Sequence, residues 1–122
     1  MFMKKALFLI ALMLGSVTAF AQKMNKNEVK QLQAFAAQTS EKGGTNGEAL
    51  KITDMSSPST WEGITVENGR VVAIQWKDKH LAGELNLSGF TALKKVDVSR
   101  NAITSINVTG DAALSNLNAS RN

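Results

Sequence analysis

The second half of the chain repeats one pattern of apolar and polar positions at a fixed spacing. The first clear copy places apolar residues and one amide at Leu93, Val96, Val98, Asn101 and Ile103. The pattern returns 21 residues later at Leu114, Leu117, Ala119 and Asn122. A fixed period of this length predicts a solenoid, in which each supersecondary unit buries its apolar face against the next unit.

A less regular copy precedes these two. Val71, Ile74, Trp76 and Leu81 take the positions that Leu93, Val96, Val98 and Ile103 hold in the next unit. Polar and apolar residues alternate along residues 95–99. This alternation predicts a short parallel strand with Val96 and Val98 buried and with Lys95, Asp97 and Ser99 turned outward. Trp76 replaces an aliphatic residue at an inward position, so we expect it to fill the wide end of the core beneath an N-terminal helix.

Ahead of the repeats, the pattern predicts a helix and a hairpin. The helix is expected to begin at a cap at Asn27 and to end near Gln38, with one apolar face formed by Val29, Leu32, Phe35 and Ala36. Residues 39–47 are rich in turn formers, and residues 56–60 are expected to form a loop. Two β-prone runs, 64–66 and 71–74, flank Asn68 and Gly69. This pair predicts a tight hairpin because both residues tolerate positive φ.

Residues 1–21 have the features of a secretory signal peptide. Lys4 and Lys5 precede an apolar stretch at residues 6–17, and residues 19–21 supply the small-x-small cleavage pattern. The stretch is short for a bilayer span, and an uncleaved anchor helix is the alternative. Cleavage would leave a cap at 22–70 and repeats at 71–122. We therefore expect an exported chain, in the periplasm, at the cell surface or secreted, with no membrane insertion after cleavage.

Charge and composition exclude several classes of function. The chain has 14 basic and 10 acidic residues, and loss of Lys4 and Lys5 leaves an excess of two, which is too small to predict a nucleic-acid partner. With no cysteine and one histidine, we expect no metal site and no cofactor. Asp78 and His80 are close in sequence, but no serine stands in a Gly-x-Ser-x-Gly turn. We expect His80 to be a solvated loop residue and the protein not to be an enzyme.

The unit that begins at Leu93 resembles a leucine-rich repeat. From Trp61 to Leu85 the chain resembles the N-terminal cap and first repeat of plant-type extracellular members of that family. The cysteine-free chain is most similar to bacterial versions found in Bacteroidetes, and Val66 stands where a cap cysteine is common. The resemblance covers about residues 32–122. It implies an α+β repeat solenoid, with a helix and β-hairpin cap followed by a short parallel sheet.

The resemblance places ligands on the concave strand face. The candidate binding residues there are Gln75, Lys77, Lys95, Asp97, Ser99, Asn116, Asn118 and Ser120. It implies recognition of a protein or glycan, as in an adhesin, while a solvated face with no ligand fits the same residues. Asn101 and Asn122 are expected to form a structural ladder, each amide satisfying backbone groups where a strand bends away. Lys79 interrupts this ladder in the first unit.

The last copy of the pattern leaves apolar residues without a following unit. The chain holds about two and a half units, whereas at least about three are needed for a stable stack. Leu114, Leu117 and Ala119 would lose burial worth about 1.5–3 kcal/mol for each large aliphatic side chain. We therefore expect either a structural fragment of a larger, truncated surface protein or self-stacking of chains through this open C-terminal end.

Overall fold

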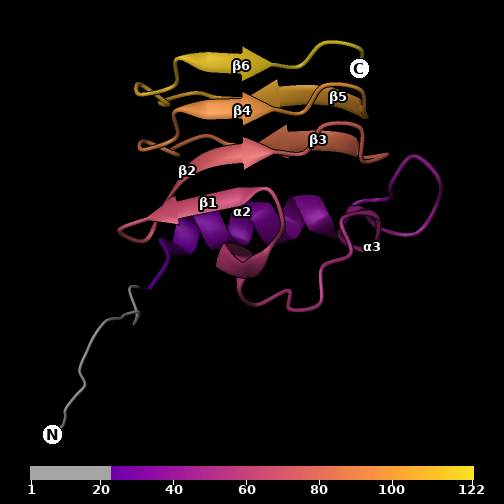
Figure 1. The fold of residues 1–122 in the computed structure, drawn as a ribbon, viewed down its shortest axis with the longest axis horizontal. Helices are drawn as coiled ribbons and strands as arrows, with labels where there is room; N and C mark the ends of the chain where they lie inside the picture. The colour runs from indigo at the N-terminus through magenta and orange to yellow at the C-terminus, as the bar shows by residue number, and fades with distance from the viewer. Residues whose placement is uncertain (1–22) are drawn as a thin grey trace, which may run out of the picture.

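The computed structural model describes residues 23–122, and the signal peptide predicted at residues 1–21 lies outside this range. The described chain forms two helices, one short 3-10 turn and six strands (Figure 1). In chain order these are α2 Lys26–Ala36, α3 Asn46–Ala49, η2 Pro58–Thr60, β1 Ile64–Glu67, β2 Arg70–Gln75, β3 Ala82–Asn86, β4 Lys95–Asp97, β5 Ala102–Asn107 and β6 Asn116–Asn118. Within the described range, neither helix has the length and apolar character needed to cross a membrane.

The strands form two separate sheets. The larger sheet has the order β1-β2-β4-β6, with β1 antiparallel to β2 and the other neighbours parallel. Ile74 pairs with Val96, and Val96 pairs with Leu117, so the repeated spacing correctly predicts the register of β2, β4 and β6. The smaller sheet consists of β3 and β5 in parallel. Figure 1 shows β6 at the end of the larger sheet that lies farthest from α2.

This architecture shows that the predicted fold class is wrong. An α+β repeat solenoid needs equivalent units in series, whereas the described chain has two helices, a mixed four-stranded sheet and a two-stranded parallel sheet. The antiparallel β1–β2 pair makes the larger sheet mixed. The smaller sheet has only β3 and β5. The regular spacing therefore sets the register of three strands without generating a solenoid of repeats.

The N-terminal helix is confirmed with different ends. Asn25, and not Asn27, is the N-cap of α2, because the Asn25 side chain accepts a hydrogen bond from the backbone N–H of Glu28. The helix ends at Ala36, two residues before the expected end. A second short helix, α3, lies partly within the segment expected to consist of turns. It begins with a capping box in which Thr45 and Glu48 satisfy each other's backbone N–H groups.

Trp76 lies in the core beneath α2, as the sequence predicts. Its side chain is fully buried, and its ring stacks on Phe35 of α2 with 5.5 Å between ring centroids. Val96 and Val98 are fully buried as well. The hairpin is also confirmed, since β1 pairs with β2 and both turn residues have positive φ. The buried side chains of α2 therefore pack against the buried side chains of the parallel strands. This packing fixes the positions of the strands and so of their exposed side chains.

Candidate functional site

The larger sheet presents most of the predicted binding residues on one exposed strand face. Gln75, Lys77, Lys95, Asn116, Asn118 and Ser120 are exposed, and Asp97 is partly buried. Lys95 pairs with Asn116 in one row across the sheet, and Gln75, Asp97 and Asn118 form the next row. Neighbouring strands of a sheet lie about 4.8 Å apart. The face is therefore an ordered array of polar side chains.

Ser99 departs from the predicted outward orientation. Its exposed fraction is only 2%, and its hydroxyl donates a hydrogen bond to Asp97 Oδ1 at 2.7 Å. The Ser99 backbone N–H donates to the same oxygen at 3.0 Å. These two donors hold the pKa of Asp97 below its usual range, and the positive charges of Lys77 and Lys95 act in the same direction. Asp97 is therefore a fixed anion between two lysines on the strand face.

Asn101 lies directly behind the end of this face. Its Oδ1 accepts hydrogen bonds from the backbone N–H groups of Lys79 and Leu81. Its Nδ2 donates to the carbonyl oxygens of Trp76, Val98 and Ser99. One amide thus ties the chain after β2 to the chain after β4. Because the amide satisfies buried backbone groups on both sides, it determines where the strand ends lie.

Asn122 makes the corresponding bonds one strand further along. Its Oδ1 accepts from the Ile103 N–H, and its Nδ2 donates to the carbonyl oxygens of Val98, Ala119 and Ser120. Asn46 on α3, which the sequence analysis did not single out, does similar work at the start of β3. It exchanges two hydrogen bonds with the Ala82 backbone and donates to the Phe35 carbonyl oxygen. The three asparagine side chains therefore fix the backbone around the exposed face, since all of their hydrogen bonds are made to backbone groups.

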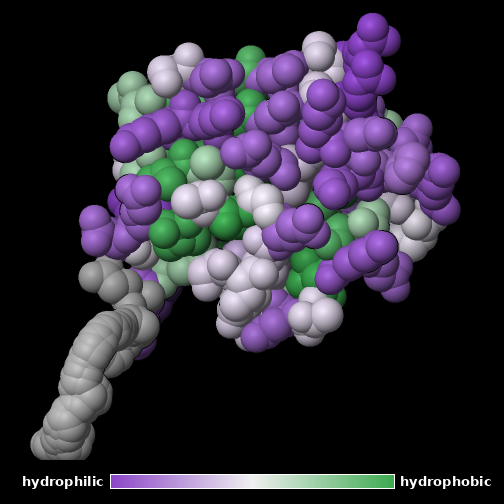
Figure 2. All heavy atoms as spheres, in the orientation of Figure 1, coloured by the Kyte–Doolittle hydropathy of each residue, from purple (hydrophilic) through white to green (hydrophobic). Residues whose placement is uncertain are grey.

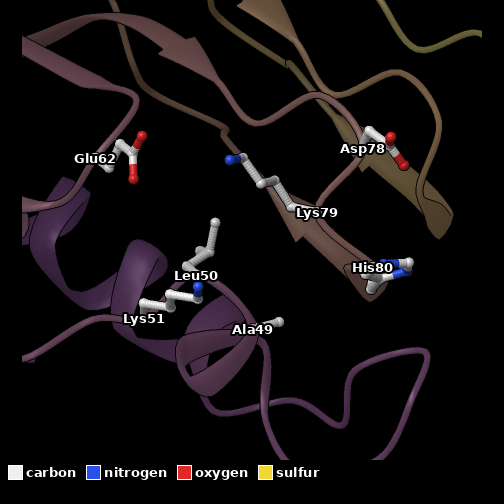
Figure 3. Close-up of a pocket in the computed structure, with 7 residues that line it drawn as sticks. All are labelled: Ala49, Leu50, Lys51, Glu62, Asp78, Lys79 and His80. Atoms are coloured by element: carbon white, nitrogen blue, oxygen red, sulfur yellow. The ribbon is translucent and has the colours of Figure 1, made fainter.

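A hollow of about 260 Å³ lies between α3 and the segment that follows β2. Its lining residues are Ala49, Leu50, Lys51, Glu62, Asp78, Lys79 and His80. Figure 3 shows Lys79 extending across the hollow toward Glu62, with Asp78 and His80 on the opposite side from Glu62. His80 Nδ1 lies 3.3 Å from Glu41 Oε1, and both side chains are about half exposed. His80 thus pairs with Glu41, and no hydrogen bond joins it to Asp78 within the described chain.

A second hollow, of about 400 Å³, opens at the end toward which β4 and β6 run. It is lined by Glu41, Lys42, Asp78, His80, Arg100, Asn101 and Arg121. The sequence analysis did not select Arg100 or Arg121. The sequence does contain a pattern that relates them: Ser99-Arg100 and Ser120-Arg121 are 21 residues apart and take the same place in two successive copies of the repeat.

A partly buried ion pair near the hairpin was not predicted from the sequence. Glu28 is fully buried, its Oε2 accepts from Arg70 Nε at 2.8 Å, and its Oε1 accepts from the Val71 N–H. Arg70 also donates to the Gly89 carbonyl oxygen and to the Thr91 hydroxyl. Both carboxylate oxygens of Glu28 have a partner inside the fold, so the network fixes α2 against β2. Nothing in the spacing of these residues along the chain indicates that they meet.

Comparison with known proteins does not add to this geometry. No protein-family model matches the chain, and searches of the curated proteins and of the solved structures find no match. Across residues 23–122, no three His, Cys, Asp or Glu side chains come together in a way that would hold a metal ion. The interpretation of the site therefore depends on its own side chains.

Proposed function

We propose that this protein is a recognition module that binds a protein ligand across the exposed face of β2, β4 and β6. The observation that carries the proposal is the register of these strands, which aligns Lys95 with Asn116 and Gln75 with Asp97 and Asn118. Alternate residues, such as Ile74 and Val96, are fully buried beneath this face. The exposed side chains therefore start from fixed positions, and binding requires little ordering of the backbone.

The composition of the face favours a protein over a glycan. Its exposed members are amides, lysines and a serine, with Asp97 as a fixed negative charge between Lys77 and Lys95. No aromatic ring stands among these residues to stack on a sugar. Alternating amides and charges suit the polar groups of a protein surface, where they provide register and specificity.

The proposed setting is outside the cytoplasm. It follows from the basic residues, the apolar stretch and the small-x-small pattern within residues 1–21. A recognition module exported in this way would meet ligands in the periplasm, at the cell surface or in the medium. Detection of a new N-terminus at Gln22 in the exported protein would test this assignment, and an intact leader on the mature protein would contradict it.

The proposed binding face can be tested with matched variants. The wild-type protein, a triple variant Gln75→Ala, Lys95→Ala and Asn116→Ala, and the control Lys30→Ala on the exposed side of α2 would each be immobilised. Envelope and medium fractions of the source cells would be passed over them. A protein retained by the wild type and the control, and reduced about tenfold or more on the triple variant, is the expected result. Equal retention by all three would contradict the proposal, and loss of retention after deglycosylation would assign a glycan instead.

A second candidate function is structural self-association through the edge of β6. The observation that favours it is Leu117, a large apolar side chain with an exposed fraction of 44%. Leu114 and Ala119 beside it are only partly buried against the core. Edge strands also expose unpaired backbone groups that pair readily with a further strand. A second copy of the chain, docked on β6, would cover both the apolar side chain and this edge.

A further inference from the structure

Arg100 and Arg121 lie on neighbouring strand ends. The Arg100 N–H donates a hydrogen bond to the Ser120 carbonyl oxygen at 2.9 Å, and the Asp78 N–H donates to the Ser99 carbonyl oxygen at 2.9 Å. Asp78, Arg100 and Arg121 therefore form one column, each residue following the end of β2, β4 or β6. Adjacent strands are about 4.8 Å apart, so the two guanidinium-bearing side chains begin from neighbouring points.

The local backbone does not explain the choice of arginine at these two positions. Arg100 has φ +60° and Arg121 has φ +58°, in the left-handed region. This region suits glycine or asparagine and costs about 1–2 kcal/mol for other residues. Two arginines in the same column also repel each other, because like charges in register are unfavourable.

The charge of the two arginines is not neutralised within the described chain. Neither guanidinium has a carboxylate within salt-bridge distance in residues 23–122. Glu41 Oε1 lies 3.3 Å from His80 Nδ1 and is not within salt-bridge distance of either arginine. Lys42, Arg100 and Arg121 provide three permanent positive charges around the same hollow, against the two carboxylates Glu41 and Asp78. The hollow therefore has an unmatched positive charge.

The hollow is open to solvent and larger than a single small anion, so the arginine side chains and not its walls would hold an anion there. Its volume is about 400 Å³, and Asn101, whose amide is bound to the backbone, forms part of its wall. Figure 2 shows hydrophilic side chains crowded at the end of the molecule toward which β4 and β6 run. Guanidinium groups donate paired hydrogen bonds to oxyanions, and this pairing is more directional than that of lysine.

We propose that this hollow binds a tetrahedral oxyanion, a sulfate or phosphate group, between Arg100 and Arg121. A sulfate or phosphate group has more acceptor oxygens and a larger negative charge than a carboxylate, so it can accept paired hydrogen bonds from two guanidinium groups at once on different oxygens. Lys42 and His80 stand at the rim and add positive charge, His80 only when it is protonated. The site adjoins the end of the proposed protein-binding face and is inferred independently of that face.

The test is a titration of isotopically labelled protein, followed by NMR at constant ionic strength so that general screening does not change. The probes are inorganic sulfate, inorganic phosphate, acetate and N-acetylglucosamine 6-sulfate. We expect saturable shifts at Arg100 and Arg121 with the tetrahedral anions, and affinity about tenfold lower in Arg100→Gln and in Arg121→Gln. Arg100→Lys keeps the charge and should also bind more weakly, while the control Lys30→Gln should bind as the wild type does.

The outcomes separate the sources and decide the proposal. Tighter binding of the sulfated sugar than of the free ions assigns the group to a larger ligand, and the reverse order assigns a free ion. Both results support the site. Shifts that do not saturate, unchanged affinity in both glutamine variants, an equal loss in Lys30→Gln, or acetate binding as tight as sulfate would overturn it. Both arginines are exposed, so the variants are expected to keep the wild-type fold.

Discussion

The side chain of Asn101 makes five hydrogen bonds to the backbone, most of them in the buried interior. Each buried backbone group left without a partner costs about 1–3 kcal/mol. We expect Asn101→Ala to lower the free energy of unfolding by about 3 kcal/mol, measured by urea denaturation. Asn122→Ala is the matched control, because this amide is exposed and makes similar bonds, and it should cost about 1 kcal/mol. Equal losses in the two variants would contradict the role given to burial.

Asp111 is a buried carboxyl group with one oxygen in use. Its Oδ1 accepts the Phe90 N–H at 2.9 Å, while Oδ2 has no partner among the described residues. Burial raises the pKa of Asp111, the nearby charge of Glu28 adds to this effect, and the Phe90 hydrogen bond opposes it. The native state therefore binds the Asp111 proton more tightly than the unfolded state does.

Asp111→Asn keeps the acceptor for Phe90 and removes the charge. We expect the stability of this variant relative to the wild type to rise as pH rises through the raised pKa of Asp111, because the wild type then has to keep a charge buried. This relative stability should fall as pH falls through the raised pKa of Asp111 and should become independent of pH well below the unfolded value of 3.8, where Asp111 is protonated in both states. Urea denaturation across this pH range measures it. A difference that grows toward acid pH would show that the sign is wrong.

Single residues were predictable from the sequence where the 21-residue spacing constrains them. The inward positions of Val96 and Val98 follow from alternation, and both are fully buried. Ser99 breaks the alternation because Asp97 captures its hydroxyl and N–H beyond the end of β4. The pairing of Glu28 with Arg70 joins residues far apart in the chain, and no local pattern encodes such a contact.

The β1–β2 hairpin depends on a close approach at Gly63, just before β1. Gly63 has φ +90°, and a Cβ added there would collide with the Gln75 carbonyl oxygen and the Trp76 ring. Gly63→Ala should therefore cost about 3 kcal/mol of stability. Gly43→Ala is the control, because Gly43 has a similar φ of +88° in open space and should cost only about 1 kcal/mol. Thermal unfolding compares the two, and equal losses would mean that the collision is relieved without cost.

The helices and strands that a short stretch of sequence specifies were predicted, whereas those that depend on contacts between distant residues or on very short segments were not. The Asn68 and Gly69 turn and the apolar face of α2 are both specified in this way. The short helix α3 has only four residues and lies in a segment rich in glycine, where helical periodicity cannot be detected. The parallel pairing of β3 with β5 joins two segments through non-local hydrogen bonds, one of them interrupted by Gly83.

The whole-molecule fold was the weakest part of the sequence prediction. The spacing from Leu93 to Asn122 correctly sets which residues of β2, β4 and β6 pair. It does not encode the antiparallel β1 strand or the short second sheet. A register repeated over three strands is therefore compatible with a small mixed-sheet domain, and a solenoid does not follow from it.

Self-association through β6 is testable in the intact protein. We expect sedimentation velocity to show a larger species as concentration rises, and the melting temperature to rise with it, because association stabilises the folded state by mass action. Leu117→Asp should abolish both effects by placing a charge on the exposed edge. Thr104→Asp, on the exposed part of β5, is the control. A wild-type protein that stays monomeric at all concentrations would contradict this candidate.

The central claim, that the face of β2, β4 and β6 is the binding surface, is tested most directly by site-specific photocrosslinking in the source cells. A photoreactive amino acid would replace Asn116 on the face or Lys30 on α2, both of which are exposed. We expect a discrete crosslinked protein from position 116, none from position 30, and competition by unlabelled wild type but not by the triple face variant. Crosslinking from position 30 alone, or equal competition by the triple variant, would contradict the claim.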